Sequence, residues 1–208
     1  MRTELPAARV RNAVPLPLRG ADGLATVATA YTFDRLVDGR EHLALRLRDP
    51  EEPDAEVPLV RLHSECLTGD VLGSQRCDCG PQLRESIERL TAAGGYLLYL
   101  RQEGRGIGLY NKLDAYGLQD TGLDTYQANV ALGHGPDERD YAVAAQMLLA
   151  LGVEELSLLS NNPDKAAQLA AAGLTVVERL PTAVHLSPAN ADYLAAKARH
   201  GAHDLEVG

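Results

Sequence analysis

Aromatic residues and basic runs are scarce in this sequence. Phe, Trp and Tyr together make up 4 % of the chain, Trp is absent, and the formal net charge is −9 with no long run of Lys or Arg. A nucleic-acid partner requires a basic surface that neutralises phosphates. The composition therefore argues against nucleic acid as a partner, and a polyanionic ligand would have to be bound by a few specific cations.

Long apolar runs are also missing. No stretch approaches the ~20 apolar residues of a membrane-spanning helix, and residues 1–20 are interrupted by charge and proline, unlike a signal peptide. We therefore expect no membrane association and a cytoplasmic protein. At 208 residues the chain is long enough to bury a hydrophobic core without the help of disulfides or structural metals, and we expect a single domain over residues 1–208.

Cysteine is rare but concentrated. All three cysteines, Cys66, Cys77 and Cys79, lie in the stretch RLHSECLTGDVLGSQRCDCGPQ, residues 61–82. In a reducing compartment such a cluster indicates metal ligands rather than disulfides. A structural zinc site usually has four protein ligands, whereas a catalytic site has three and leaves the fourth position to water, which then ionises near neutral pH. The pattern favours an open, catalytic Zn²⁺ site.

Other interpretations of this stretch remain open. The pair Cys77 and Cys79 could be a redox pair, although its spacing is not C-x-x-C. A closed structural site is possible if His63 supplies a fourth ligand. His63 and Glu65 also satisfy the H-x-E half of the zinc nucleobase deaminase signature, but the P-C-x-x-C half is absent.

Hydrophobic periodicity predicts strands in the first third of the chain and an alternation of strands and helices after it. We expect an α/β (α+β) fold in which a β-rich N-terminal part leads into alternating strands and helices around one core. The expected strands are 24–32, 42–48, 57–62, 96–100, 153–159 and 174–179, and the expected helices are 81–93, 111–119, 138–151, 163–172 and 187–200.

Two further stretches have the pattern of ligand sites. RQEGRGIGLYNKL, residues 101–113, places a glycine-punctuated turn between a strand and a helix, a geometry that can hold an anion, although it matches neither glycine-rich nucleotide fingerprint and could be a simple turn. Residues 120–140 are long and polar for a connector. Lys165 lies in the first turn of a helix, where it is either a solvated lysine or a receptor for phosphate.

With these motifs assembled, the chain resembles the GTP cyclohydrolase II family over about residues 42–193. The motifs agree in order: RLHSECLTGD, RCDCGPQL, RQEGRGIGL, NKLDAYGLQD, DERD and SNNPDK. The resemblance is to the single-function form. It implies zinc-dependent hydrolysis of GTP that opens the guanine imidazole ring at C8, releases formate and pyrophosphate, and yields 2,5-diamino-6-(5-phospho-ribosylamino)pyrimidin-4(3H)-one, the first step of riboflavin synthesis.

The resemblance also implies roles for individual residues. It assigns one Zn²⁺ per chain to the three cysteines, the second hydrolysis to Tyr116, and the attack on the α-phosphorus to Asp137 as proton acceptor and Arg139 as nucleophile. A guanidinium stays protonated in almost any protein environment. Charge stabilisation is therefore the easier role for Arg139, and a helix cap is the simpler interpretation of Asp137.

Substrate contacts carry over in the same way. A carboxylate can accept from guanine N1–H and the exocyclic amine, so Glu103 is our hypothesis for base selection. Arg61, Arg105 and Lys165 are candidate triphosphate contacts, with Mg²⁺ on the triphosphate. The family also implies a homodimer. The substrate-binding residues are Arg61, Leu62, His63, Ser64, Glu65, Gln82, Glu103, Gly104, Arg105, Thr125, Ser160 and Lys165.

Three positions depart from the family pattern. Ser160 replaces the usual threonine, Asp114 stands where a basic residue is expected, and Gly117 stands where alanine is usual. The last two are near Tyr116 and bear on the second hydrolysis. Two alternatives therefore accompany the main hypothesis: a variant that stops at the formamidopyrimidine product, and a catalytically silent zinc- or nucleotide-binding regulatory protein.

Overall fold

The structure is a computed structural model, and it describes residues 5–20, 23–48, 55–191 and 193–194. The chain divides into two compact units. The sheet unit comprises Met1–His63, Arg84–Arg101 and Tyr141–Thr182, and the cysteine unit comprises Ser64–Leu83, Gln102–Asp140 and Ala183–Gly208. The expectation of a single domain stays a prediction.

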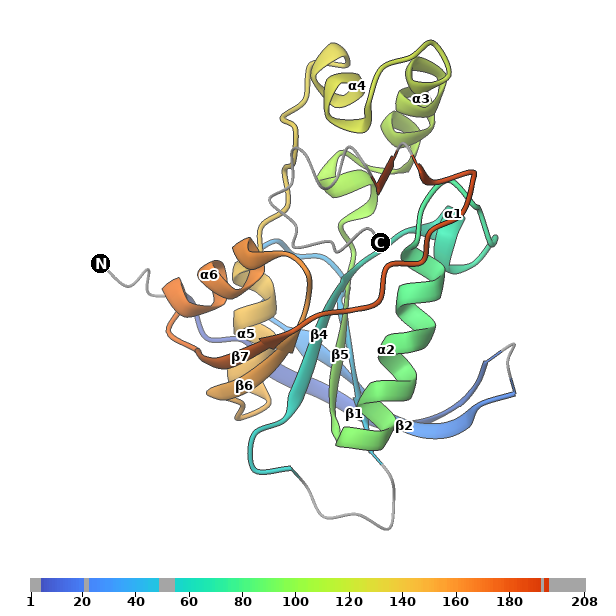
Figure 1. The fold of residues 1–208 in the computed structure, drawn as a ribbon. Coiled ribbons are helices and arrows are strands. Elements are labelled where there is room, and N and C mark those ends of the chain that lie inside the picture. The colour runs from blue at the N-terminus through green and yellow to red at the C-terminus, as the bar shows by residue number, and fades with distance from the viewer. Residues whose placement is uncertain (1–4, 21–22, 49–54, 192, 195–208) are drawn as a thin grey trace. The chain divides into compact units, whose positions relative to one another are not determined.

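The sheet unit is built on a seven-stranded mixed sheet with the order β1-β2-β3-β5-β4-β6-β7. The pairs from β1 to β5 are antiparallel, whereas β4, β6 and β7 pair in parallel. In Figure 1 the blue β1 and the orange β7 form the two edges. This mixed architecture confirms the expected α/β (α+β) class. The strands are β1 (Arg9–Arg19), β2 (Ala25–Asp34), β3 (Leu43–Leu47), β4 (Leu59–Ser64), β5 (Gly95–Leu100), β6 (Glu155–Leu159) and β7 (Thr175–Leu180).

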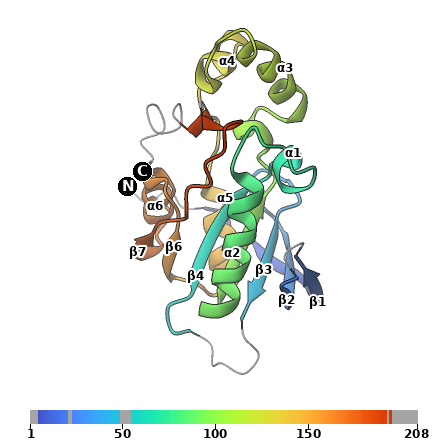
Figure 2. The same ribbon diagram turned by 45° about the vertical axis from the view of Figure 1, so that its right-hand side comes forward.

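Helices cover the sheet and complete its core. Figure 2 shows α2 (Cys79–Ala93) in front of the sheet and α5 (Ala142–Ala150) behind β4. Helix α6 (Pro163–Ala171) connects β6 to β7. Helix α5 is buried almost all round, as expected of a helix inside a core rather than on a surface. The core joins apolar residues of β3, β4, β5 and β6 to α5, among them Ala44, Val60, Leu62, Leu98, Leu100, Val143, Met147, Leu148, Leu156 and Leu158.

A close approach of two backbones fixes the start of β5. A Cβ added to Gly95 would lie 1.9 Å from the carbonyl oxygen of Leu59 in β4, and 3.0 Å from Cδ2 of Leu90 in α2. Only glycine permits this contact. It aligns β4, the strand that leads directly into the first cysteine of the chain.

Short helices make up the cysteine unit. They are α1 (Leu67–Asp70), the 3-10 turn η1 (Glu103–Gly106), α3 (Leu109–Gln119) and α4 (Thr125–Ala131). Helix α4 begins with a capping box, in which the Asp124 carboxylate accepts from the amides of Tyr126 and Gln127 and the Gln127 side chain accepts from the Asp124 amide. No helix within the described ranges is both long and apolar enough to cross a bilayer.

The predicted strands and most predicted helices are present, with ends shifted by a few residues. Four elements were not expected: β1, α4 and the short α1 and η1. β1 contains Pro15 and Pro17, and it lies at the sheet edge, where a missing N–H is tolerated. Helix α4 lies in residues 120–140, a stretch that is long and polar for a connector but was not predicted to be helical.

One predicted helix boundary is wrong. The helix expected over 138–151 begins only at Ala142, because the preceding segment hydrogen bonds elsewhere. The Glu138 amide donates to the Arg105 carbonyl at 3.0 Å, and the Asp140 carbonyl accepts from the Gln102 side chain. Asp137 is therefore not a helix cap. The helix expected over 187–200 falls largely outside the described residues.

Candidate active site

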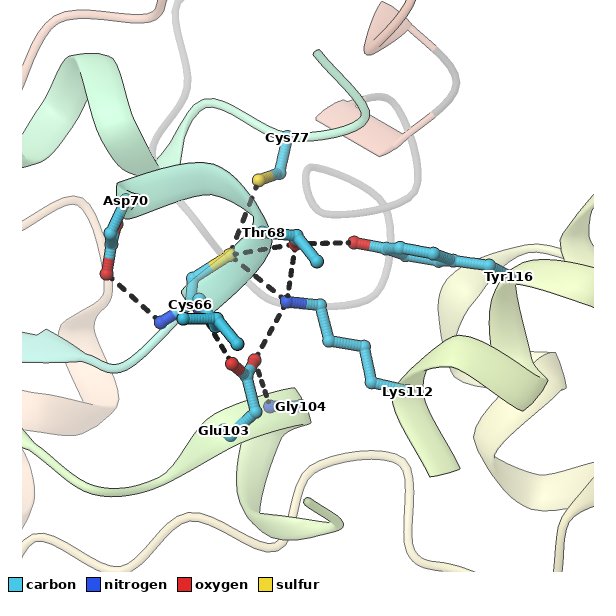
Figure 3. A network of polar contacts seen from close by, with 9 residues as sticks. Cys66, Thr68, Asp70, Cys77, Glu103, Gly104, Lys112 and Tyr116 are labelled. Carbon is cyan, nitrogen blue, oxygen red and sulfur yellow. Dashed lines mark hydrogen bonds and ion pairs between the residues drawn. The ribbon is translucent and has the colours of Figure 1, made fainter. Parts of the chain in front are cut away.

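The three cysteines come together in the cysteine unit. Cys66 immediately precedes α1, Cys77 precedes α2, and Cys79 is the first residue of α2. Their sulfur atoms all lie within 4.8 Å of one another, and Cys66 Sγ and Cys77 Sγ are 3.6 Å apart (Figure 3). Cys66 and Cys77 are buried and Cys79 is half-buried. Such a set can act as three ligands of one metal ion.

A glycine makes room beside these sulfurs. A Cβ on Gly69 of α1 would lie 2.9 Å from Cys77 Sγ and 3.1 Å from Cys66 Sγ. At such distances a sulfur would have to shift, so this space exists because residue 69 has no side chain. Three thiolates favour a soft or borderline ion such as Zn²⁺. The donor set and the space beside it therefore fit the metal that the sequence predicts.

The pKa values of the clustered thiols differ. Hydrogen bonds from Cys77 and Cys79, helped by the charge of Lys112, lower the pKa of Cys66 although burial opposes this. The hydrogen bond to Cys66, with burial, raises the pKa of Cys77 to about 11. Cys66 is thus the first thiolate of the group, and binding a metal would release the protons of the other two.

Lys112 of α3 is the cation of this site, and sequence reasoning missed it. Its Nζ lies 3.2 Å from Cys66 Sγ, 3.0 Å from Thr68 Oγ1 and 2.8 Å from Glu103 Oε1 (Figure 3). The Lys112 and Glu103 side chains are 12 % and 9 % exposed. Burial alone would lower the pKa of Lys112, but Glu103 and the Cys66 thiolate raise it above its ordinary value. Lys112 is therefore a permanent cation.

Glu103, the residue proposed to select the base, is tied to the cysteine loop. Its Oε2 accepts from the Leu67 amide at 2.7 Å, and its Oε1 accepts from Gly104 N at 3.0 Å as well as from Lys112. The carboxylate thus links η1, α3 and the start of α1. A signal for Lys112 was present in NKLDAYGLQD, because Lys112 and Tyr116 are four residues apart and share a helix face.

Tyr116 is held at the edge of the same network. Its Oη lies 3.3 Å from Thr68 Oγ1, and the Arg76 guanidinium lies 4.8 Å from the centre of its ring. Burial raises the pKa of the Tyr116 phenol, and the hydrogen bond with Thr68 and the charge of Lys112 only partly oppose this. The phenol is therefore protonated at neutral pH.

The two unusual residues near Tyr116 are exposed to solvent. Asp114 and Gly117 are both exposed, and a Cβ on Gly117 would meet no atom within 4 Å. These departures from the family pattern therefore leave the surroundings of the Tyr116 hydroxyl unchanged.

Asp137 and Arg139 form an ion pair. Arg139 Nε donates to Asp137 Oδ1 at 2.8 Å, and Arg139 Nη2 donates to Asp137 Oδ2. Their side chains are 33 % and 13 % exposed. Burial would raise the pKa of Asp137, but the hydrogen bonds and charge of Arg139 outweigh it and lower that pKa. Asp137 therefore stays ionised beside the guanidinium of Arg139.

Arg105 occupies a strained position in η1. Its φ is +61°, in the left-handed region, which costs a residue other than glycine about 1 kcal/mol or more. Its guanidinium lies 4.2 Å from the ring centre of Tyr126 and 6.0 Å from that of Tyr193, and its Nη1 is buried without a hydrogen-bond partner. Strain of this kind is typical of ligand sites.

The remaining predicted contacts of the cysteine unit have simpler surroundings. Ser64 Oγ lies 3.4 Å from Gln102 Oε1, and Gln82 donates to Asp78 Oδ2 at 2.6 Å. Glu65, Gly104 and Thr125 are half-buried, and Thr125 is the first residue of α4.

Five predicted contacts belong to the sheet unit. Lys165 is 6 % exposed and donates to the Leu62 carbonyl at 2.7 Å, so it is not a solvated lysine. Arg61, also buried, donates to the Leu159 carbonyl at 3.1 Å. The His63 ring stacks on Tyr99, and the Ser160 hydroxyl accepts from the Asn162 amide at 3.0 Å.

Comparisons with known proteins give a consistent result. The model of the GTP cyclohydrolase II family matches residues 18–181. A GTP cyclohydrolase-2 of Vibrio cholerae is 52 % identical over 180 residues, covering 86 % of this chain and 90 % of that protein. That of Psychromonas ingrahamii is 47 % identical over 197 residues, covering 95 % and 97 %. The riboflavin biosynthesis protein RibBA of Bacillus subtilis is 53 % identical over 177 residues, covering 84 % and 44 %.

Proposed function

Because this chain belongs to the GTP cyclohydrolase II family, we propose that it opens the imidazole ring of GTP at C8 and releases formate and pyrophosphate. It is a hydrolase of this family, which acts on GTP in riboflavin biosynthesis. The proposed product is 2,5-diamino-6-(5-phospho-ribosylamino)pyrimidin-4(3H)-one. The observation that carries the proposal is the group of three sulfur atoms, all within 4.8 Å of one another, beside the space at Gly69.

The three cysteines are proposed to hold one Zn²⁺ per chain. Bound there, the ion would supply Lewis acidity and activate water at neutral pH, which a poor electrophile such as guanine C8 requires. With three protein ligands the site keeps a position for water and substrate. The buried cation of Lys112 partly balances the negative charge of the sulfurs.

Tyr116 is proposed to serve the second hydrolysis, in which the formyl group leaves as formate. Its phenol is protonated and lies one hydrogen bond from the loop that holds Cys66. The placement of Asp114 and Gly117 on the exposed face supports full deformylation rather than an arrest at the formamide.

Asp137 and Arg139 are proposed to serve the release of pyrophosphate. The charged guanidinium stabilises negative charge at the α-phosphorus, and the Asp137 carboxylate orients it through two hydrogen bonds. A nucleophilic Arg139 would have to lose a proton that Asp137 stabilises. Charge stabilisation is therefore the role that we propose.

The substrate contacts that we propose are those expected from the sequence. Arg61, Arg105 and Lys165 are proposed to bind the triphosphate together with Mg²⁺, and Glu103 to select guanine. The other proposed contacts are Leu62, His63, Ser64, Glu65, Gln82, Gly104, Thr125 and Ser160. A homodimer is also proposed, and sedimentation analysis of the purified protein would reveal its mass.

The decisive experiment is product analysis. The purified protein is mixed with GTP and Mg²⁺, with and without a zinc chelator, and the products are identified by mass spectrometry and a formate assay. Formate, pyrophosphate and the diaminopyrimidinone are expected, and all should vanish on chelation and return with added Zn²⁺. A formylated product without formate would contradict the role of Tyr116 alone.

A cysteine variant separates catalysis from a purely structural metal. Cys77→Ser is expected to abolish turnover while circular dichroism of the sheet is retained. Cys77→Ser that unfolds the chain would favour a structural zinc, and a folded, zinc-loaded wild type without turnover of GTP would favour a silent binding protein.

A further inference from the structure

The hydrogen bonds of Lys112 have only one possible direction. An ammonium group carries three N–H donors and no acceptor. Lys112 Nζ has three acceptors within reach, Cys66 Sγ at 3.2 Å, Thr68 Oγ1 at 3.0 Å and Glu103 Oε1 at 2.8 Å (Figure 3). All three donors are therefore used, and Thr68 Oγ1 must act as an acceptor toward Lys112.

This constraint passes to the hydrogen of Thr68. A hydroxyl has one hydrogen to donate. The other neighbours of Thr68 Oγ1 are Tyr116 Oη at 3.3 Å and Cys66 Sγ at 3.8 Å. The tyrosine oxygen is the closer of the two, and Cys66 Sγ already accepts from Lys112 and contacts Cys77 Sγ. Thr68 therefore donates to Tyr116 Oη, and the hydrogen of Tyr116 is left to point away from Thr68.

Both ends of this chain are anchored within the cysteine unit. At one end, Glu103 is held by the amides of Leu67 and Gly104 as well as by Lys112. At the other, Arg76 lies against the Tyr116 ring and binds the Asp120 carboxylate at 2.8 Å and 3.0 Å. The direction of the hydrogen bonds is thus set from the Glu103 end, where the carboxylate is held by two backbone amides.

We propose that Lys112 and Thr68 are positioning residues that turn the Tyr116 hydroxyl into a hydrogen-bond donor toward the formyl oxygen of the reaction intermediate. This rests on the proposed function of Tyr116. In the hydrolysis, the oxygen of water bonds to the formyl carbon, the C–N bond breaks, one proton of the water passes to the nitrogen, the other is released to solvent, and formate leaves. Negative charge develops on the formyl oxygen, where a fixed donor stabilises it without giving up its own proton.

The first test is the ratio of the two products. Thr68→Val keeps the shape of the side chain and removes the hydroxyl, so it should slow formate release about tenfold relative to ring opening and let the formylated intermediate accumulate. Thr68→Ser retains the hydroxyl and should retain the wild-type ratio. Because both products come from one preparation, the ratio does not depend on the fraction of protein that carries zinc.

A matched control and a double variant sharpen this test. Thr121→Val removes another hydroxyl of the cysteine unit, one that donates to the Leu118 carbonyl, and should leave the ratio unchanged. Tyr116→Phe should raise the intermediate strongly, and adding Thr68→Val to it should cause no further loss. Independent, multiplying losses would overturn the proposal, as would a wild-type ratio in Thr68→Val.

The second test needs no turnover. Protein containing 3-fluorotyrosine is examined by ¹⁹F NMR, and the resonance of residue 116 is assigned by its loss in Tyr116→Phe. Thr68→Val and Lys112→Met should both shift that resonance, whereas Thr68→Ser and Thr121→Val should not. An unchanged chemical shift of residue 116 in Thr68→Val would overturn the proposal even if the enzyme is active. If the wild type releases no formate but the resonance responds as expected, the positioning stands and the proposed role of Tyr116 in deformylation fails.

Discussion

At the scale of single residues, the candidate zinc site depends on a missing side chain as much as on three thiols. Gly69 lies in α1 with its α-carbon facing the sulfur group, and a Cβ there would come within 2.9 Å of Cys77 Sγ. Its backbone is helical, so alanine can adopt this conformation, but the alanine methyl group would crowd Cys77 Sγ. This contrast makes Gly69 a test of the metal site that leaves all its ligands in place.

We predict that Gly69→Ala weakens zinc binding by roughly 10- to 100-fold, the range seen when the surroundings of metal ligands are altered. Competition with a chromophoric chelator would measure the affinity. Gly117→Ala is the control, because its added methyl meets no atom within 4 Å. Equal affinities of Gly69→Ala and the wild type would place the metal away from this space.

The Asp137 and Arg139 pair predicts a pH dependence of stability. The pKa of Asp137 is held below its ordinary value of 3.8, so the unfolded chain takes up a proton at a higher pH than the folded chain does. The pair therefore stabilises the fold above about pH 4, and this contribution is lost as the pH falls through the folded pKa. The free energy of unfolding, measured by urea denaturation at a series of acid pH values, should fall less steeply with decreasing pH in Asp137→Asn than in the wild type. An unchanged slope would mean that the pair is broken in solution.

At the scale of secondary-structure elements, α3 and α4 carry the predicted residues Tyr116 and Thr125, yet both have weak points. Helix α3 contains Gly117, which lowers its intrinsic stability. Helix α4 has only seven residues and relies on its capping box. Because short helices have little stability by themselves, the glycine and the capping box should measurably affect the stability of these two helices.

We predict that Gly117→Ala raises the free energy of unfolding by about 0.5–1 kcal/mol, because alanine loses less backbone entropy in a helix and its methyl meets no neighbour here. Chemical denaturation would measure the change. The product ratio with GTP should stay at the wild-type value, since residue 117 is exposed. A loss of stability would indicate an unseen contact at this position.

The N-cap of α4 gives the opposite prediction. Asp124→Ala removes the acceptor of the Tyr126 and Gln127 amides and should lower the free energy of unfolding by about 1 kcal/mol. Asp124→Ser keeps a capping oxygen and should retain most of the wild-type free energy of unfolding. If serine and alanine behave alike in urea unfolding, the cap contributes nothing to stability.

At the scale of the whole molecule, the division into units separates the apolar core from the metal site. The main hydrophobic cluster belongs to the sheet unit, whereas all three cysteines belong to the cysteine unit. The cysteine unit is made of short helices, which depend more on specific polar contacts. Loss of the metal should therefore not affect the two units equally.

We predict that removing zinc loosens the cysteine unit selectively. Hydrogen–deuterium exchange with and without chelator should show lost protection in peptides from residues 64–83 and 102–140, while β4, β5 and β6 stay protected. Exchange in Cys77→Ser should resemble that of the chelated wild type. Uniform loss of protection across both units would show that the metal supports the entire fold.

The sequence by itself determined the family, most of the elements and the three cysteines as candidate metal ligands. Cys66, Cys77 and Cys79 are identifiable as candidate ligands because all three cysteines of the chain lie within residues 66–79. Strands such as β3 and helices such as α6 follow from hydrophobic periodicity and local turn and capping signals. These features are encoded over short stretches, where neighbouring residues carry the information.

Only the tertiary structure decided what surrounds the ligands. Lys112 reaches a cysteine 46 positions earlier in the chain, and its spacing from Tyr116 indicates a shared helix face but not that contact. The segment 138–141 is not helical because it bonds to η1 and its neighbours, which overrides its propensity. The space beside Gly69 depends on distances of a few tenths of an ångström. Such contacts join residues that are distant along the chain, so their geometry is set by packing rather than by periodicity.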